Sequence, residues 1–171
     1  MHRLIVGVTG CGKSTLAKII AWEHRRAGDN VFVCDPWQAS DWHCDASIPK
    51  VDDAIEFLFQ QKRGGAVIFD EAGLAEAFMR LDENNRIVAA ARHYGYAIYF
   101  LAQRYIQVPP KLRDNITTIY VFRQPPIVAK EMAKQWYSPG DPILKTPNLK
   151  RFEFLKLAGW KPASWHRIEK I

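Results

Sequence analysis

The sequence contains little cysteine and no long apolar run. Its three cysteines, Cys11, Cys34 and Cys44, are an odd number without framework spacing. This pattern excludes a disulfide-stabilised scaffold and is typical of reduced thiols in a cytoplasm. A zinc site at Cys34, His43 and Cys44 is disfavoured, because paired C-x-x-C spacing and a fourth ligand are missing.

No apolar run approaches the roughly 18–20 residues that span a bilayer. The chain is already strand-like at Arg3, so we expect no signal peptide. Internal repeats and low-complexity segments are also missing from the sequence. At 171 residues the chain suits a single domain, 1–171, with a core over about 3–137 and a basic extension over about 138–171.

Positive charge is concentrated in the second part of the chain. The whole chain has a net charge of +6. Residues 1–100 carry 11 Lys or Arg against 13 Asp or Glu, whereas residues 101–171 carry 13 against 5. A basic half beside a weakly acidic one indicates a polyanionic partner, nucleic acid first. A solvated basic surface that keeps the protein soluble is the alternative that charge alone leaves open.

The segment GVTGCGKST, residues 7–15, directly follows the apolar run LIV. It fits the phosphate-loop pattern G-x-x-x-x-G-K-[ST], in which glycines let backbone N–H groups turn toward a phosphate. Lys13 would reach the β- and γ-phosphates, and the Ser14 hydroxyl would help to hold Mg²⁺. A glycine-rich turn with an incidental lysine is the weaker alternative. The predicted nucleotide ligands are Thr9, Gly10, Cys11, Gly12, Lys13, Ser14 and Thr15.

A second motif, AVIFDEAG, ends in two adjacent acids. Four apolar residues carry Asp70 to the end of a predicted strand, where its carboxylate would join Ser14 in holding Mg²⁺. Glu71 is placed to orient and deprotonate a water that attacks the γ-phosphate. Two solvated acids at a strand end are the alternative. Together with the phosphate loop, the pair favours an ATPase over a small-molecule kinase.

Three further polar residues are candidates for catalysis. Gln103 ends an apolar strand at the edge where the other site residues emerge, so it would sense the γ-phosphate by hydrogen bonding. Arg92 precedes that strand and Arg113 follows it. Either would project across a subunit boundary as an arginine finger, which stabilises charge in the transition state. For each arginine a surface salt bridge remains an equal alternative.

Strands and helices alternate along the chain, which predicts an α/β fold: a mostly parallel sheet with helices on both faces. We expect the ligand at the carboxyl ends of the strands. The terminal segments RFEFLKLAG and SWHRIEKI predict a β-hairpin. Strands are predicted at 3–9, 30–35, 66–71, 96–103 and 117–123, and helices at 13–28, 51–59, 82–95 and 127–136.

The ordered motifs resemble the FtsK–HerA superfamily of DNA-pumping ATPases, and most of all its viral genome-packaging branch. That branch includes the packaging ATPases of tailless, membrane-containing phages and poxvirus-type relatives. The resemblance covers residues 3–123 and leaves the segment after Gln124 unmatched. It rests on DP at 35–36, DE at 70–71, AR-x-x-G…AQR over 91–104 with RHYG at 92–95, and P-x-x-L-R-x-N at 109–115.

The resemblance implies a RecA-like (ASCE) P-loop NTPase in which the Gln103 strand lies between the phosphate-loop strand and the Asp70 strand. It implies ATP and Mg²⁺ as ligands, and a homo-oligomeric ring, a hexamer, that translocates double-stranded DNA into a preformed capsid. Capsid or portal-vertex proteins would be partners, and the viral membrane would be a further contact. The protein would then work in the host cytoplasm or at the virion packaging vertex.

Other functions share parts of this pattern. A conjugation or filamentous-phage assembly motor of the same superfamily would carry every motif above. A nucleoside or nucleotide kinase has the same phosphate loop, but we find no arginine-rich lid segment and no base-and-sugar motif. A regulatory nucleotide switch without turnover is disfavoured by Glu71, Gln103 and the arginines.

Overall fold

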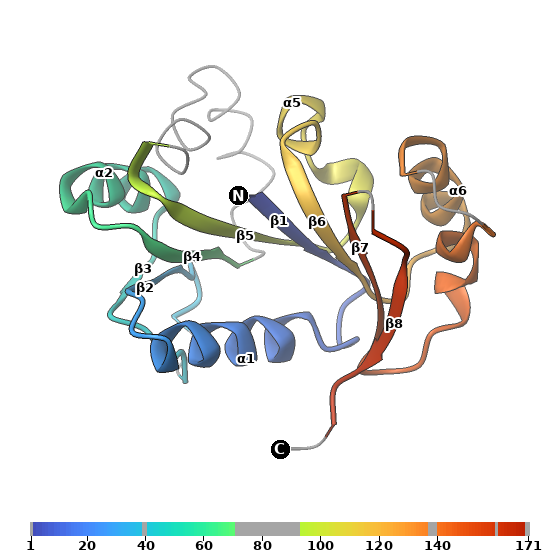
Figure 1. Ribbon diagram of the computed structural model, residues 1–171, viewed down its shortest axis with the longest axis horizontal. Coiled ribbons are helices and arrows are strands. Elements are labelled where there is room, and N and C mark those ends of the chain that lie inside the picture. The colour runs from blue at the N-terminus through green and yellow to red at the C-terminus, as the bar shows by residue number, and fades with distance from the viewer. Residues whose placement is uncertain (1, 39–40, 71–92, 137–139, 160, 170–171) are drawn as a thin grey trace.

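An open sheet of eight strands runs through the middle of the molecule (Figure 1). The computed structural model describes residues 2–38, 41–70, 93–136, 140–159 and 161–169. The strand order is β3-β2-β4-β5-β1-β6-β7-β8. The strands are β1 (His2–Val6), β2 (Val31–Cys34), β3 (Ala46–Ile48), β4 (Gly65–Phe69), β5 (Tyr96–Ala102), β6 (Ile116–Val121), β7 (Glu153–Ala158) and β8 (Ser164–Arg167).

Strands β1 to β6 pair in parallel, whereas β7 pairs antiparallel with β6 and β8 antiparallel with β7. The central strands are buried on both faces. In β1, for example, Leu4 and Val6 pack on one side of the sheet, while Ile5 packs on the other. Both-sided burial explains why these strands read as continuous apolar runs.

Helices cover both faces of the sheet (Figure 1). Helix α1 packs on one face through Leu16, Ala17 and Ile20, whose spacing places them on one side of a helix. Helices α2 and α6 pack on the other face. The helices are α1 (Lys13–Arg26), α2 (Val51–Gln61), η2 (Tyr105–Gln107), α5 (Pro110–Arg113), α6 (Pro126–Gln135) and η3 (Pro142–Asn148). In the described part of the chain, none of them is long and apolar enough to cross a membrane.

The predicted strands, the terminal hairpin and the placement of helices on both faces are confirmed. Strand β5, which leads to Gln103, lies between β1 and β4 as the resemblance implied. The strands predicted from the sequence do not include β3, a short strand that pairs with β2. The helix predicted over 82–95 falls almost entirely outside the described residues.

Candidate functional site

The phosphate-loop segment connects β1 to α1 at the carboxyl edge of the parallel strands. Its backbone is held on both sides: the Gly7 N–H donates to the Ala102 carbonyl at 3.2 Å, and the Val8 N–H donates to the Arg123 carbonyl at 3.0 Å. A Cβ at Gly7 would lie 2.5 Å from Cβ of Phe122. Only glycine therefore lets the loop leave the sheet between β5 and β6.

Helix α1 begins directly after Gly12, whose φ of +114° lies in a region that residues with a side chain rarely adopt. No side chain caps this N-terminus, and its first turn carries no acidic residue. Helix α2, in contrast, has Asp52 and Asp53 in its first turn. Uncapped N–H groups at the positive end of the helix dipole favour an anion.

Lys13 turns back into the loop. Its Nζ donates hydrogen bonds to the carbonyl oxygens of Gly7 at 2.8 Å and Val8 at 3.2 Å, and its side chain is buried. These carbonyls hold the ammonium at the mouth of β1, where a bound phosphate would meet it. Ser14 and Thr15 are exposed at the start of the helix. The loop geometry therefore fits the phosphate groups and the metal-ligand hydroxyl predicted for this segment.

Two aspartates lie side by side where β4 and β2 end. The Asp70 N–H donates to the Cys34 carbonyl at 2.9 Å, which continues the β2–β4 ladder by one residue. The Asp35 carboxylate is 1% exposed and accepts bonds from the Trp37 N–H and the Trp42 Nε1–H, each at 3.0 Å. Asp35 thus anchors the following loop, whereas the partly buried Asp70 is the carboxylate that stands at the sheet edge.

The thiol of Cys34 lies in acidic surroundings at this edge. Burial raises the pKa of Cys34 to about 12, and the negative charges of Asp35, Asp53 and Asp70 act in the same direction. The thiol is therefore neutral at any physiological pH. The concentration of carboxylates makes this part of the edge a favourable place for a divalent cation. Within the described residues, however, no group of three His, Cys, Asp or Glu side chains could hold a metal by itself.

Gln103 follows β5 and is exposed at the same edge. Its predecessor Ala102 accepts the hydrogen bond from Gly7, so Gln103 lies beside the start of the phosphate loop. The fold thus brings Lys13, Asp70 and Gln103 to one edge of the sheet. Glu71 and Arg92, the predicted base and finger, lie outside the described residues.

Arg113 lies at the other edge, just before β6 begins. Its guanidinium packs 5.1 Å from the centre of the Tyr105 ring, and its Nη1 donates to Gln135 Oε1 at 3.1 Å. The Tyr105 hydroxyl donates to the same Gln135 oxygen at 2.7 Å. Arg113 is therefore separated from the phosphate loop of its own chain.

Two residues near the loop carried no signal in the sequence. The Phe152 N–H donates to the Cys11 carbonyl at 2.8 Å, and its ring lies against Gly12. The Gln124 amide is 1% exposed, and neither its Nε2 nor its Oε1 has a hydrogen-bond partner among the described residues. Gln124 directly follows Arg123, whose carbonyl binds Val8. No motif identifies either residue, since long-range packing alone brings both to the loop.

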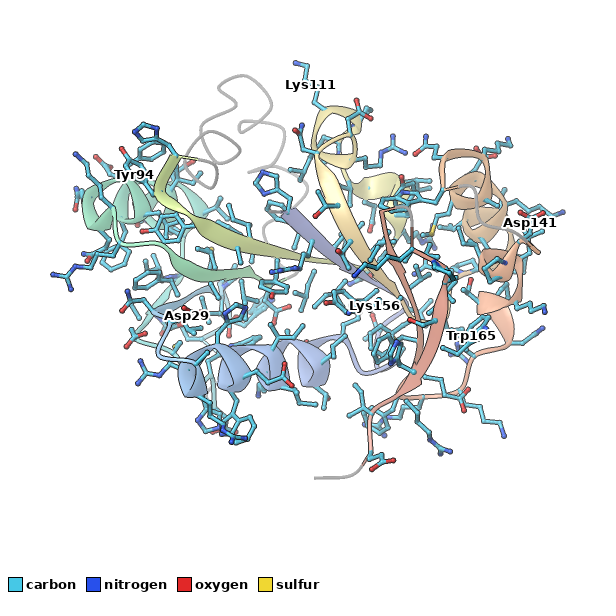
Figure 2. The ribbon with its side chains drawn as sticks, viewed as in Figure 1. Asp29, Tyr94, Lys111, Asp141, Lys156 and Trp165 are labelled. Carbon is cyan, nitrogen blue, oxygen red and sulfur yellow. The ribbon has the colours of Figure 1, made fainter. Side chains whose placement is uncertain are left out.

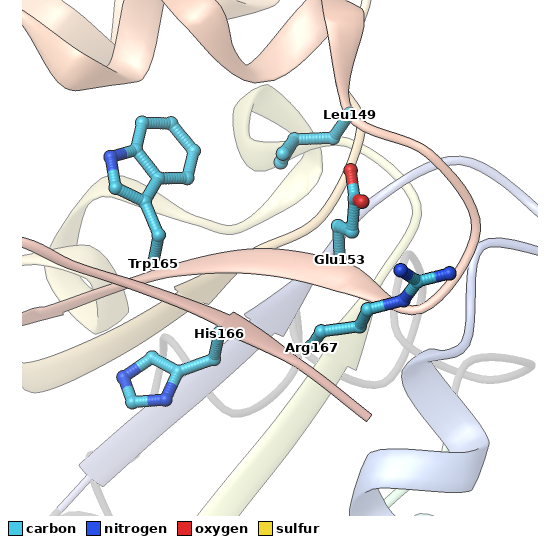
Figure 3. A pocket seen from close by; sticks show the side chains of 5 residues that line it. All are labelled: Leu149, Glu153, Trp165, His166 and Arg167. Atoms are coloured by element: carbon cyan, nitrogen blue, oxygen red, sulfur yellow. The ribbon is translucent and has the colours of Figure 1, made fainter. Parts of the chain in front are cut away.

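A shallow pocket of about 360 Å³ lies on the C-terminal hairpin (Figure 3). Trp165 and His166 point to opposite sides of β8, and Arg167 stands opposite Glu153 in the β7–β8 pair. The ring of His166 stacks on the ring of Phe154, with 5.2 Å between the ring centres. The pocket is lined by Leu149, Glu153, Trp165, His166 and Arg167.

Solved structures share this architecture. The DNA-packaging ATPase B204 from Sulfolobus turreted icosahedral virus has a TM-score of 0.78 at 17% sequence identity, over 99% of this chain and 98% of B204. The genome-packaging NTPase B204 from Sulfolobus turreted icosahedral virus 2, in complex with ATP-gammaS, has a TM-score of 0.75 at 17% identity, over 97% of this chain and 96% of B204. The chain has the fold of these viral packaging ATPases.

Another solved structure has the same fold. VirB4 of Thermoanaerobacter pseudethanolicus has a TM-score of 0.79 at 10% identity, over 99% of this chain and 90% of VirB4. The predicted RecA-like class, with a mostly parallel open sheet, is confirmed. At these identities the likeness is one of fold. No protein-family model and no curated protein sequence matches the chain.

Proposed function

We propose that this chain is an ATP-hydrolysing motor that translocates double-stranded viral DNA into a preformed capsid. The observation that carries the proposal is the phosphate loop: Lys13 turned into it, an uncapped helix N-terminus behind it, and Asp70 and Gln103 at the same sheet edge. The fold shared with two viral packaging ATPases supports viral DNA as the cargo.

Each residue at the edge has a task in this proposal. The Lys13 ammonium exchanges its two carbonyl partners for oxygens of the β- and γ-phosphates, so a satisfied buried cation remains satisfied. The Ser14 hydroxyl and the Asp70 carboxylate would hold Mg²⁺, which would supply positive charge to the phosphates. The Gln103 amide hydrogen-bonds the γ-phosphate and reports whether it is present.

Hydrolysis itself requires a base. The water oxygen bonds to the γ-phosphorus, its proton passes to the Glu71 carboxylate, and the bond to the β,γ-bridging oxygen breaks, giving ADP and phosphate. An arginine of a neighbouring subunit, Arg92 or Arg113, stabilises the charge that develops on the transferred group. The separation of Arg113 from its own phosphate loop is compatible with such an action in trans.

The working form in this proposal is a homo-oligomeric ring, a hexamer, with DNA as polyanionic cargo and with capsid or portal-vertex proteins as docking partners. It would act in the host cytoplasm at the packaging vertex. The fold shared with the pCW3 conjugation coupling protein TcpA favours one second candidate, a motor of the conjugation type, which uses the same nucleotide site.

Phosphate release from ATP, measured with and without linear double-stranded DNA, tests the proposal. We expect Mg²⁺-dependent release that DNA stimulates in the parent protein and that Lys13→Ala abolishes. Transfer of the γ-phosphate to an added nucleoside, with no release to water, would instead identify a kinase. ATP binding without any turnover in assembled protein would contradict a motor.

A further inference from the structure

We propose that Arg151 and Phe152 form the surface on which the base of the bound nucleotide stacks. The inference rests on the proposed nucleotide site and adds to it a base-binding element from the C-terminal extension, a part of the chain that matched no motif. The phosphates would bind at the N-terminus of α1, beside Gly12, Ser14 and Thr15. The ribose links the phosphates to the base, so the base would lie only one ribose away from these residues. A base-binding group must therefore lie beside this end of the loop.

Phe152 is held at this position in an uncommon backbone conformation. Its φ is +69°, in the left-handed region that is unfavourable for an aromatic residue. Two backbone hydrogen bonds maintain it: its N–H donates to the Cys11 carbonyl at 2.8 Å, and its carbonyl accepts from the Ile168 N–H at 2.9 Å. Strained residues of this kind gather at ligand sites, where the surrounding structure keeps them in place.

The ring of Phe152 lies directly on the phosphate loop. A Cβ at Gly12 would come within 2.7 Å of its Cδ1, so no residue larger than glycine fits between the ring and the start of α1. The Arg151 guanidinium lies over the same ring, 4.6 Å from its centre, and its side chain is exposed. The Phe152 ring thus lies against the loop, and the planar guanidinium of Arg151 covers the ring from outside.

Flat groups of this kind bind nucleobases. An aromatic ring and an arginine plane both stack on base π-faces, and such contacts are tolerant of base identity because every base has a π-face. The turn is also closed by two hydrogen bonds of its own. The Lys150 N–H donates to Glu153 Oε2 at 2.9 Å, and the Glu153 N–H donates to the Lys150 carbonyl at 3.2 Å. Base binding would therefore order little additional chain.

The nearby hairpin supplies a matched control. Trp165 is a half-exposed aromatic residue that lines the pocket in Figure 3, and it has no contact with the phosphate loop among the described interactions. Substitutions of Phe152 and of Trp165 thus distinguish a base site on the loop from a base site in the pocket.

Calorimetric titration with MgATP and with magnesium tripolyphosphate, which lacks base and sugar, tests the inference. We expect the parent to bind ATP more tightly than tripolyphosphate. Phe152→Ala should weaken ATP binding about tenfold, within the range of stacking contacts, and leave tripolyphosphate binding unchanged. Arg151→Lys keeps the charge and removes the plane, so it should reduce ATP affinity alone. Trp165→Ala should change neither, and circular dichroism confirms the fold of each variant.

The outcomes separate the two proposals. If the parent binds neither ligand, the proposed nucleotide site is wrong and the base surface falls with it. If it binds both ligands equally, or if Arg151→Lys and Phe152→Ala both keep the parent preference for ATP, the nucleotide site stands and the base surface is wrong. Loss of the ATP preference in Trp165→Ala alone would place the base in the hairpin pocket and overturn the assignment to Arg151 and Phe152.

Discussion

The backbone N–H of Phe152 donates a 2.8 Å hydrogen bond to the carbonyl of Cys11, which joins the C-terminal extension to the phosphate loop. The extension is also continuous with the sheet, because β7 pairs with β6 along Thr118 to Val121. Movement of the loop on nucleotide binding would therefore be felt at the start of β7. The hairpin that carries Trp165 and Lys156 is built on the same connection (Figure 2).

Lys13→Ala should weaken MgATP binding about 10- to 100-fold, because it removes a charged hydrogen-bond donor from the phosphate site. Equilibrium binding of a fluorescent ATP analogue measures this. Lys111→Ala is the matched control, since Lys111 lies on α5 and projects away from the body of the molecule (Figure 2). Parent-like affinity in Lys13→Ala would remove the basis of the site.

Glu71→Gln should leave ATP binding intact and lower turnover by about 10²-fold or more, because an amide cannot take the proton from water. Binding and steady-state phosphate release are measured on the same preparation. Glu56→Gln, an exposed glutamate of α2, controls for the removal of one negative charge. Turnover at the parent rate in Glu71→Gln would exclude this residue as the base.

An arginine that acts in trans should be detectable by mixing subunits. Glu71→Gln and Arg92→Ala subunits are each expected to be inactive alone. A mixed ring should recover some turnover, at interfaces where an intact Glu71 faces an intact Arg92. The same mixture with Arg113→Ala tests the second candidate, whose removal also takes a hydrogen bond from Gln135. If assembly is verified and neither mixture recovers activity, both finger assignments fail.

The exposed basic residues of the hairpin should bind DNA without sequence preference. Lys161→Gln together with Arg167→Gln should flatten the dependence of log affinity on log salt, by about 0.9 for each phosphate that the protein no longer neutralises. Basal turnover should stay at the parent rate. Lys62→Gln with Arg63→Gln, an exposed pair after α2, removes the same charge elsewhere. An unchanged slope in the hairpin variant would move the DNA path to other loops.

Stability should fall at alkaline pH because of Cys34. Its folded-state pKa is raised from 9.0 to about 12 by burial and by neighbouring aspartates, so the folded state keeps a proton that the unfolded chain releases. The contribution is complete below about pH 9 and is lost as the pH rises toward 12, on the order of 4 kcal/mol in total. Urea unfolding between pH 8 and pH 11 should show this decline.

Cys34→Ala provides the comparison for that measurement. The variant should be less stable at neutral pH, since it leaves a small cavity, but its free energy of unfolding should decline less steeply above pH 9. If parent and variant decline in parallel, the alkaline decrease comes from other groups, such as Tyr99, whose pKa burial also raises to about 12.

Local sequence was enough to predict the phosphate loop, because its requirements are local. A buried strand, glycines that accept positive φ and a lysine before an amphipathic helix must follow one another within a few residues. The same holds for Asp70 directly after β4 and for the terminal hairpin, whose alternation is readable within each strand. The place of the strand before Gln103, between the other two, came from the resemblance, and the strand order confirms it.

Only the tertiary structure decided which distant groups meet at that loop. Phe152 reaches Gly12, and the Val8 N–H bonds to the Arg123 carbonyl, although no spacing in the sequence links either pair. The physical reason is that such contacts depend on which surfaces remain to be covered once the sheet has formed. Periodicity and residue type describe a segment's own faces, whereas the partner of each face is chosen by the packing of the whole chain.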